Sequence, residues 1–242
     1  MNTTTQTITV SDIAVEIVRK NIKNIHLTVQ PPEGNVRISV PRHVTHENVR
    51  LMIVSKLNWI RKKQAAFRIQ PRQTPRKYVT GEIHYYRGER YILEVKEKHG
   101  KHRLSITNND KMLLTVSPGT SMKNRALVVN NWYREQLKDI IPGLIDKWEP
   151  IIGRQVKDWG IKKMKTRWGS CNIREHRIWL NLELAKKSPE CLEYVLVHEL
   201  VHLHERYHNE NFKRLMDKYY PNWRHSRELL KSEALGFEDR EC

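Results

Sequence analysis

Apolar and polar residues alternate along the first half of the chain in the way that is typical of strands. Six short stretches carry this pattern, at residues 13–18, 25–29, 36–40, 91–95, 101–106 and 112–116. The first three precede a helical pattern that Thr45 can cap, and the last three precede a helix over residues 121–148. The fourth and fifth stretches flank a glycine turn, so we expect them to pair with each other. Because both groups run from strands through a proline to a helix, we interpret residues 13–68 and 83–148 as a weak duplication.

The last third of the chain has a denser apolar pattern. Strand patterns at residues 156–165 and 177–182 are followed by a strongly apolar helix that begins after Ser188. The strand at residues 177–182 is expected to form a hairpin with the segment directly before it, residues 166–172. The predicted fold class is therefore α+β, with a strand-rich N-terminal region that also contains helices (residues 1–150) and a C-terminal core (residues 151–242).

His198, Glu199 and His202 carry the strongest chemical signal in the chain. A helix turns by about 100° per residue, so two histidines four residues apart lie on one face and can reach a single metal ion. Glu199 lies beside that face, which suits a general base that contacts a metal-bound water without ligating the metal. We therefore predict a catalytic site for one zinc ion.

Two residues compete to be the third ligand of that zinc. His208 follows His202 by six residues and can reach the metal if the helix ends and the chain folds back. Glu205 would stay on the metal face if the helix continued. We favour His208, because a neutral imidazole is a strong zinc donor. His204 is expected to lie off the metal face.

The composition is compatible with a globular core and bears on the cellular compartment in which we expect the protein. The chain has 242 residues, 38% of them hydrophobic, and no apolar run approaches the ~20 residues of a membrane span. Its first residues lack the basic and apolar regions of a signal peptide. Three cysteines without a framework pattern favour a reducing compartment. We expect a cytoplasmic protein that does not contact a membrane.

The net charge of +17 is spread unevenly along the chain. Residues 1–80 contain 14 lysines and arginines against 4 aspartates and glutamates, a balance of +10. Such a surface attracts polyanions such as nucleic acid, nucleotides or acidic protein segments. A basic protein without a polyanionic ligand explains the charge equally well.

Several short motifs together resemble one family, the YgjP-like metal-dependent hydrolases, which are relatives of the SprT-like and minigluzincin-type metallopeptidases. The motifs are Arg167-Trp168-Gly169-Ser170-Cys171, Asn181-x-x-Leu184, Tyr194-Val195-x-x-His198-Glu199-Leu200-x-His202-Leu203, His208-x-x-x-Phe212 and, upstream, Gly81-Glu82 with Tyr86-x-Gly88-x-x-Tyr91. Tyr207 departs from the family, which often has asparagine there.

The resemblance has consequences for the fold and for the site. It implies a zincin-like catalytic core, with a β-hairpin and a metal-binding helix, behind the strand-rich region. It also implies zinc ligation by His198, His202 and His208, with Glu199 as the catalytic glutamate. The natural substrates of the family are poorly defined, and both peptidase and nucleoside-triphosphate pyrophosphatase activities have been assigned to it.

The segment before the metal helix supplies the candidate substrate-binding residues. These are Arg167, Trp168, Gly169, Ser170 and Asn181. In one interpretation the segment forms the edge of the cleft, where an extended substrate pairs by strand addition. In the other, Trp168 belongs to the core and Gly169 is required by a bend. The sequence leaves both interpretations open.

Three functions follow from these observations. The first is a zinc-dependent peptidase that acts on a peptide or protein substrate. The second is a nucleoside-triphosphate pyrophosphatase that uses the same metal site, with the positive charge holding the phosphates. The third is a nucleic-acid-associated binding protein whose metal is structural and whose basic N-terminal region contacts the nucleic acid.

Overall fold

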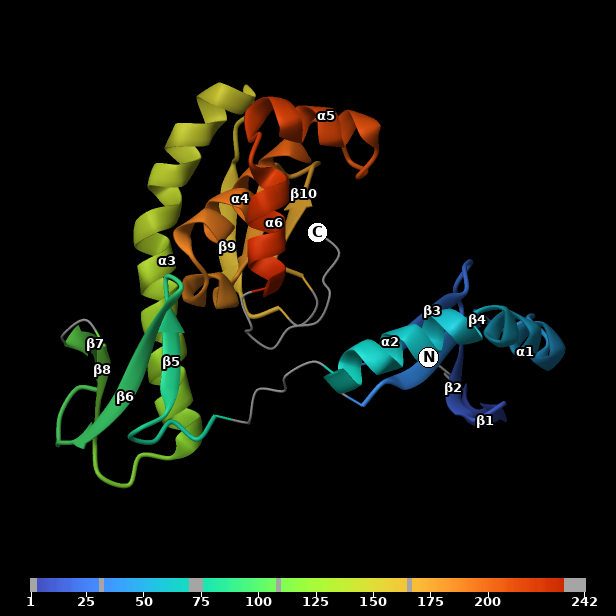
Figure 1. Cartoon of the computed structure of the whole chain (residues 1–242), viewed down its shortest axis with the longest axis horizontal. Coiled ribbons are helices and arrows are strands. Elements are labelled where there is room, and N and C mark those ends of the chain that lie inside the picture. Colours follow the sequence, from blue (N-terminus) through green and yellow to red (C-terminus); the bar gives the residue numbers. More distant parts are fainter. Residues whose placement is uncertain (1–3, 31–32, 70–75, 108–109, 165–166, 233–242) are drawn as a thin grey trace. The chain divides into compact units, whose positions relative to one another are not determined.

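The chain folds into two compact units, which the contacts divide between Gln73 and Thr74. The structure is a computed structural model that describes residues 4–30, 33–69, 76–107, 110–164 and 167–232 (Figure 1). Within these ranges it is a mixed α+β structure with six α-helices and three sheets. Residue 150, where the sequence analysis placed a boundary, lies inside a long helix of the second unit.

The first unit is a four-stranded sheet covered by two helices. Its strands, in spatial order, are β1 (Thr4–Val10), β2 (Ile13–Lys20), β4 (Asn35–Pro41) and β3 (His26–Gln30). Alternate residues of β2 and β4 are buried, as the alternating pattern predicts, and they pack on α1 (His46–Ser55) and α2 (Leu57–Ile69). Thr45 caps α1 by accepting a hydrogen bond from the Asn48 amide. The structure has two helices where the sequence pattern predicted one, because α1 ends at its C-cap Lys56 and α2 begins at Leu57.

The second unit begins with another four-stranded sheet. Its strands, in spatial order, are β5 (Ile83–Tyr86), β6 (Glu89–Glu97), β8 (Lys111–Val116) and β7 (Arg103–Thr107). The expected pairing of residues 91–95 with 101–106 is wrong, since β8 lies between β6 and β7 and pairs with both. The first strand of each sheet, β1 or β5, does not appear among the six stretches that the apolar pattern indicated.

The two four-stranded sheets share one topology. In each, the central strands are parallel and the outer strands pair antiparallel to them. In each, the chain visits the strands in the same order before it enters a helix. This arrangement is what a duplication would produce, and the duplication itself stays a prediction.

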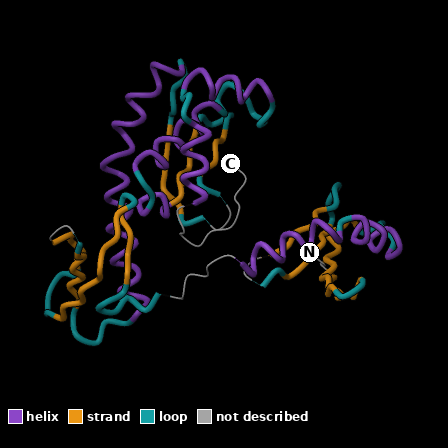
Figure 2. Tube along the Cα trace, in the orientation of Figure 1, coloured by secondary structure: helices purple, strands orange, loops and turns teal. Residues whose placement is uncertain are grey.

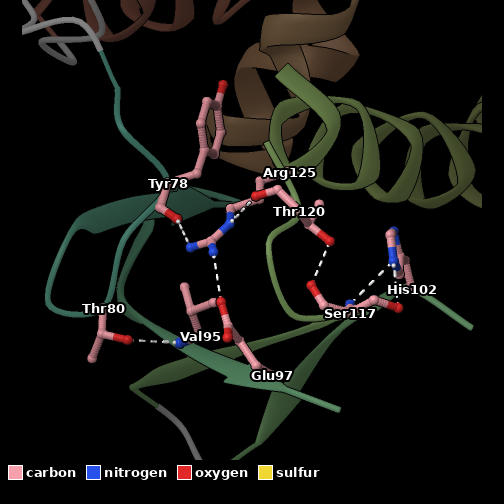
Figure 3. Close-up of polar contacts among 8 residues, drawn as sticks. All are labelled: Tyr78, Thr80, Val95, Glu97, His102, Ser117, Thr120 and Arg125. Atoms are coloured by element: carbon pink, nitrogen blue, oxygen red, sulfur yellow. Dashed lines mark hydrogen bonds and ion pairs between the residues drawn. The ribbon is translucent and has the colours of Figure 1, made fainter. Parts of the chain in front are cut away.

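Helix α3 (Met122–Ile152) connects the second sheet with the rest of its unit. Its buried residues recur every three or four positions, at Val129, Tyr133, Leu137, Ile141, Ile145, Trp148 and Ile152. Near its N-terminus, Arg125 donates hydrogen bonds to the carbonyls of Thr120 (3.0 Å) and Tyr78 (3.5 Å) and to the Glu97 carboxylate (2.9 Å), as Figure 3 shows. The bonds to Glu97 and Tyr78 fix the helix to β6 and to the segment before β5, and the bond to Thr120 holds the residues that lead into α3.

The third sheet and four helical segments form the C-terminal part of the second unit (Figure 2). The sheet order is β10 (Gly169–Asn172), β11 (Arg177–Asn181) and β9 (Asp158–Lys162). The helical segments are the 3-10 helix η1 (Leu182–Lys186), α4 (Pro189–Val201), α5 (Glu210–Tyr219) and α6 (Trp223–Ser232). The hairpin expected from the sequence is present, because β10 and β11 pair antiparallel.

Helix α4 is buried on nearly all sides, and other elements anchor it by polar contacts. From Cys191 to Val201 only Glu193 is partly exposed. The Glu193 carboxylate accepts a hydrogen bond from the Trp148 indole of α3 (2.8 Å). At the start of α4, the β5–β6 turn contacts η1 through bonds from the amides of Arg87 and Gly88 to the carbonyls of Ala185 and Lys186. A buried, multiply anchored helix can hold its side chains in fixed positions.

None of the helices in the described ranges is both long and apolar enough to cross a lipid bilayer.

The contacts of Arg125 predict its contribution to stability. Replacing it with methionine keeps the aliphatic packing but removes three hydrogen bonds at a side chain that is only 17% exposed. We expect Arg125→Met to lower the free energy of unfolding by about 1–3 kcal/mol, because each bond joins a charged group. Lys138→Met on the same helix, which removes an exposed pair with Glu135, should cost about 0–0.5 kcal/mol. Equal losses in urea unfolding would contradict the anchoring role of Arg125.

Candidate metal centre

Two histidines project from the C-terminal end of α4 onto one face. His198 is in the last turn and is buried, and His202 is the C-cap residue with right-handed helical torsions. Because His202 keeps the helical phase, the two rings lie one turn apart, with their centroids 4.9 Å from each other. The sequence expectation that the two side chains share a face therefore holds in the structure.

His208 reaches the same place from the loop between α4 and α5. Its Nε2 atom lies 2.9 Å from Nε2 of His198. The three histidines His198, His202 and His208 each offer one ring nitrogen, and these three nitrogens lie within 4.8 Å of one another. His198 and His202 are largely buried, whereas His208 is exposed. The group therefore meets solvent through His208.

The two helical histidines favour the neutral form that metal ligation requires. Burial, with the charges of His202 and His208 acting in the same direction, lowers the pKa of His198 well below its ordinary value. Burial also lowers the pKa of His202. The Nδ1–H group of His202 donates to the Glu205 carbonyl at 2.9 Å, which leaves the Nε2 lone pair for a cation. Converging imidazole lone pairs of this kind fit one divalent metal ion, and zinc is among the metals that imidazole suits.

Glu205, the rival third ligand, has a different role in the structure. Its carboxylate accepts hydrogen bonds from the Tyr207 amide and from the side-chain amide of Asn211, both at 3.1 Å. These bonds lower the pKa of the carboxyl group. The Glu205 side chain thus stabilises the turn that returns the chain to His208, a turn that contains no glycine.

Two residues complete this loop, and sequence reasoning gave neither of them a place at the metal site. Asn209 caps α5 by accepting a bond from the Phe212 amide. The Phe212 ring lies with its centroid 4.7–4.9 Å from those of all three histidines. The four-residue spacing in the motif His208-x-x-x-Phe212 was the available signal, and it served only for the family resemblance.

Glu199 lies beside the histidine group, between α4 and β10. It is 4% exposed, and its side chain lies against the backbone of Gly169. Burial raises the pKa of Glu199 to about 8, against the opposing effect of the Arg167 charge. Glu199 is therefore a buried acidic residue that directly follows His198 in α4 and faces β10.

The predicted substrate-binding residues have different environments. Arg167 is exposed and Ser170 is half-buried, whereas Trp168 is buried with the Lys187 ammonium 5.5 Å from its ring centroid. Asn181 has no exposed surface. Its side chain bonds the backbone of Met164, Arg167 and Glu183. Asn181 therefore holds the chain that leads into β10, and in this position it has no surface for a substrate.

His204 faces away from the histidine group. Its Nε2–H group donates to the Ile152 carbonyl at 2.8 Å, and its Nδ1 atom accepts from Arg154 at 3.3 Å. It therefore ties the end of α4 to the end of α3, off the metal face.

The chain resembles a known family and, among solved structures, a metallopeptidase zymogen. A family model described as "YgjP-like, metallopeptidase domain" matches residues 23–233. The crystal structure of the metallopeptidase zymogen of Pyrococcus abyssi abylysin is 26% identical to the matched part of this chain. That match covers 37% of this chain and 88% of that one, with a TM-score of 0.34. None of the curated proteins compared with the chain matches it.

The contacts of Glu205 predict its effect on metal binding. We expect Glu205→Ala to weaken zinc binding by about 10–100-fold, because ligands lose affinity when the groups that orient them are removed. The measurement is a zinc titration against a chromophoric chelator. Glu210→Ala is the matched control, since the exposed Glu210 carboxylate pairs with Lys213 on the surface of α5. An unchanged affinity in Glu205→Ala would show that the turn does not depend on this carboxylate.

Proposed function

We propose that this chain, which belongs to the YgjP-like family of metallopeptidase domains, is a zinc-dependent peptidase with a zincin-like catalytic core. The observation that carries the proposal is the convergence of three imidazole nitrogens within 4.8 Å beside a buried glutamate. In this proposal His198, His202 and His208 hold one zinc ion. Three protein ligands with a position left for water are the usual arrangement of a catalytic zinc site.

The metal and Glu199 divide the chemistry of hydrolysis between them. Zinc, when bound, lowers the pKa of water to about 7 and polarises the carbonyl that is attacked. Glu199 accepts the proton of the attacking water and passes it to the leaving nitrogen. The burial of Glu199 supports this role, because the carboxylate is held in one place and is shielded from bulk water.

The open edge of the third sheet is an argument that the substrate is a peptide. Strand β10 is an edge strand in the described part of the chain. The backbone N–H of Asn181 donates to the Trp168 carbonyl. Hydrogen-bonded pairs alternate along an antiparallel ladder, so Ser170 and Asn172 are the residues of β10 whose backbone groups bond β11. The backbone groups of Gly169 and Cys171 then point toward the open edge. An extended peptide can pair with them by strand addition, next to Glu199.

The direction of these backbone groups favours a peptide over a nucleotide. Strand addition recognises a regular series of amide donors and carbonyl acceptors, which a nucleotide lacks. The exposed Arg167 and the basic N-terminal region fit phosphates by charge, but charge alone does not select a substrate. We therefore place peptide hydrolysis first and make phosphate hydrolysis an outcome of the test.

Glu199→Gln tests the proposed reaction. The amide has the same size but cannot accept the proton, so casein cleavage by the zinc-loaded chain should fall by about 10²–10⁴-fold while zinc content stays the same. Glu228→Gln, in an exposed pair on α6, is the matched control and should cleave casein as the unmodified chain does.

Two outcomes would overturn the proposal. Casein cleavage that survives in Glu199→Gln would remove Glu199 from the reaction. Phosphate release from UTP by the unmodified chain, without casein cleavage, would replace the peptidase with a pyrophosphatase.

A further inference from the structure

The side chain of Glu199 occupies the space in which a side chain at position 169 would lie. A Cβ atom built on Gly169 would stand 2.5 Å from Oε1, 2.7 Å from Cγ and 2.9 Å from Cδ of Glu199. All three distances are below van der Waals contact. Three atoms of the glutamate are involved, so a rotation of the carboxylate tip alone would not relieve the clash.

The backbone of Gly169 does not itself require glycine. Gly169 is absent from the residues with positive φ, and it pairs with Leu180 in the regular register of β10 and β11. The alternative that the sequence left open, a glycine required by a bend, therefore has no support in its torsion angles. The crowding by Glu199 is the physical reason for a glycine at this position.

Glu199 has little room to move away. It is 4% exposed and lies in the last turn of a helix that is packed on nearly all sides. Cys171 lies two residues after Gly169 and therefore on the same face of β10. The Glu199 charge adds to the effect of burial in raising the pKa of the Cys171 thiol. The carboxylate is thus confined between α4 and the face of β10 that carries these two residues.

We propose that Gly169 is a positioning residue, whose missing side chain provides the space that sets the place of the Glu199 carboxylate beside the histidine group. The inference rests on the proposed function for its consequence in catalysis. Its structural content, the steric coupling between positions 169 and 199, does not depend on any activity.

A double-mutant cycle in thermal unfolding of the metal-free, full-length chain tests the coupling. Gly169→Ala should lower Tm when Glu199 is present, because the new methyl group forces the carboxylate out of its place. In the Glu199→Ala background the same substitution should cause no loss in Tm, since the clashing atoms are gone. An equal loss in both backgrounds would overturn the proposal.

Gly160→Ala is the matched control for this cycle. It lies in β9 of the same sheet, and the three atoms nearest to a Cβ there all belong to the Trp179 ring, the first at 2.3 Å. Gly160→Ala should lower Tm to the same extent with and without Glu199. If its effect also disappeared in Glu199→Ala, the cycle would report a general loosening and the proposal would fail.

A second measurement separates positioning from fold stability. At a temperature where all variants are folded, zinc-loaded Gly169→Ala should keep its zinc content, while kcat for casein falls by about 100-fold, as expected for a catalytic group displaced by about 1 Å. Gly160→Ala should retain kcat. An unchanged kcat in Gly169→Ala would overturn the positioning role. If the unmodified chain cleaved no casein, the proposed function would fail while the Tm cycle still decided the role of Gly169.

Discussion

The burial of α4 is the constraint on which the rest of the site depends. A helix packed on nearly all sides can carry polar side chains only where they have partners, because an unpaired buried polar group costs about 1–3 kcal/mol. His198 and Glu199 are both buried near the end of this helix. One nitrogen of His198 belongs to the group that His202 and His208 complete, and the Glu199 side chain lies against Gly169 of β10. The packing thus concentrates the chemistry of the chain at one end of one helix.

Several contacts outside the site keep α4 in that position. The β5–β6 turn bonds η1 immediately before the helix begins, and a Cβ at Gly88 would stand 3.3 Å from the Ser188 backbone. At the other end, His204 bonds the last residue of α3. Glu205 then forms the turn that brings His208 back to the group. The second four-stranded sheet therefore contributes to the site by holding the helix that carries it.

The sequence predicted those parts of the site that follow from local geometry. The shared face of His198 and His202 follows from the helical repeat, and the hairpin of β10 and β11 follows from the alternation of apolar residues. Strand order is not local, so the insertion of β8 between β6 and β7 could not be read from the pattern. The roles of Gly169 and Glu205 also depend on contacts across space. Their physical reasons, a clash with Glu199 and a bond to Asn211, became visible only when the chain was folded.

The measurement that tests the central claim most directly is the zinc stoichiometry and affinity of the purified full-length chain, determined beside His208→Ala. The convergence of His198, His202 and His208 predicts one tightly bound ion per chain, and loss of tight binding when the third imidazole is removed. Zinc bound with equal affinity by both proteins, or no zinc bound by the unmodified chain, would contradict the account.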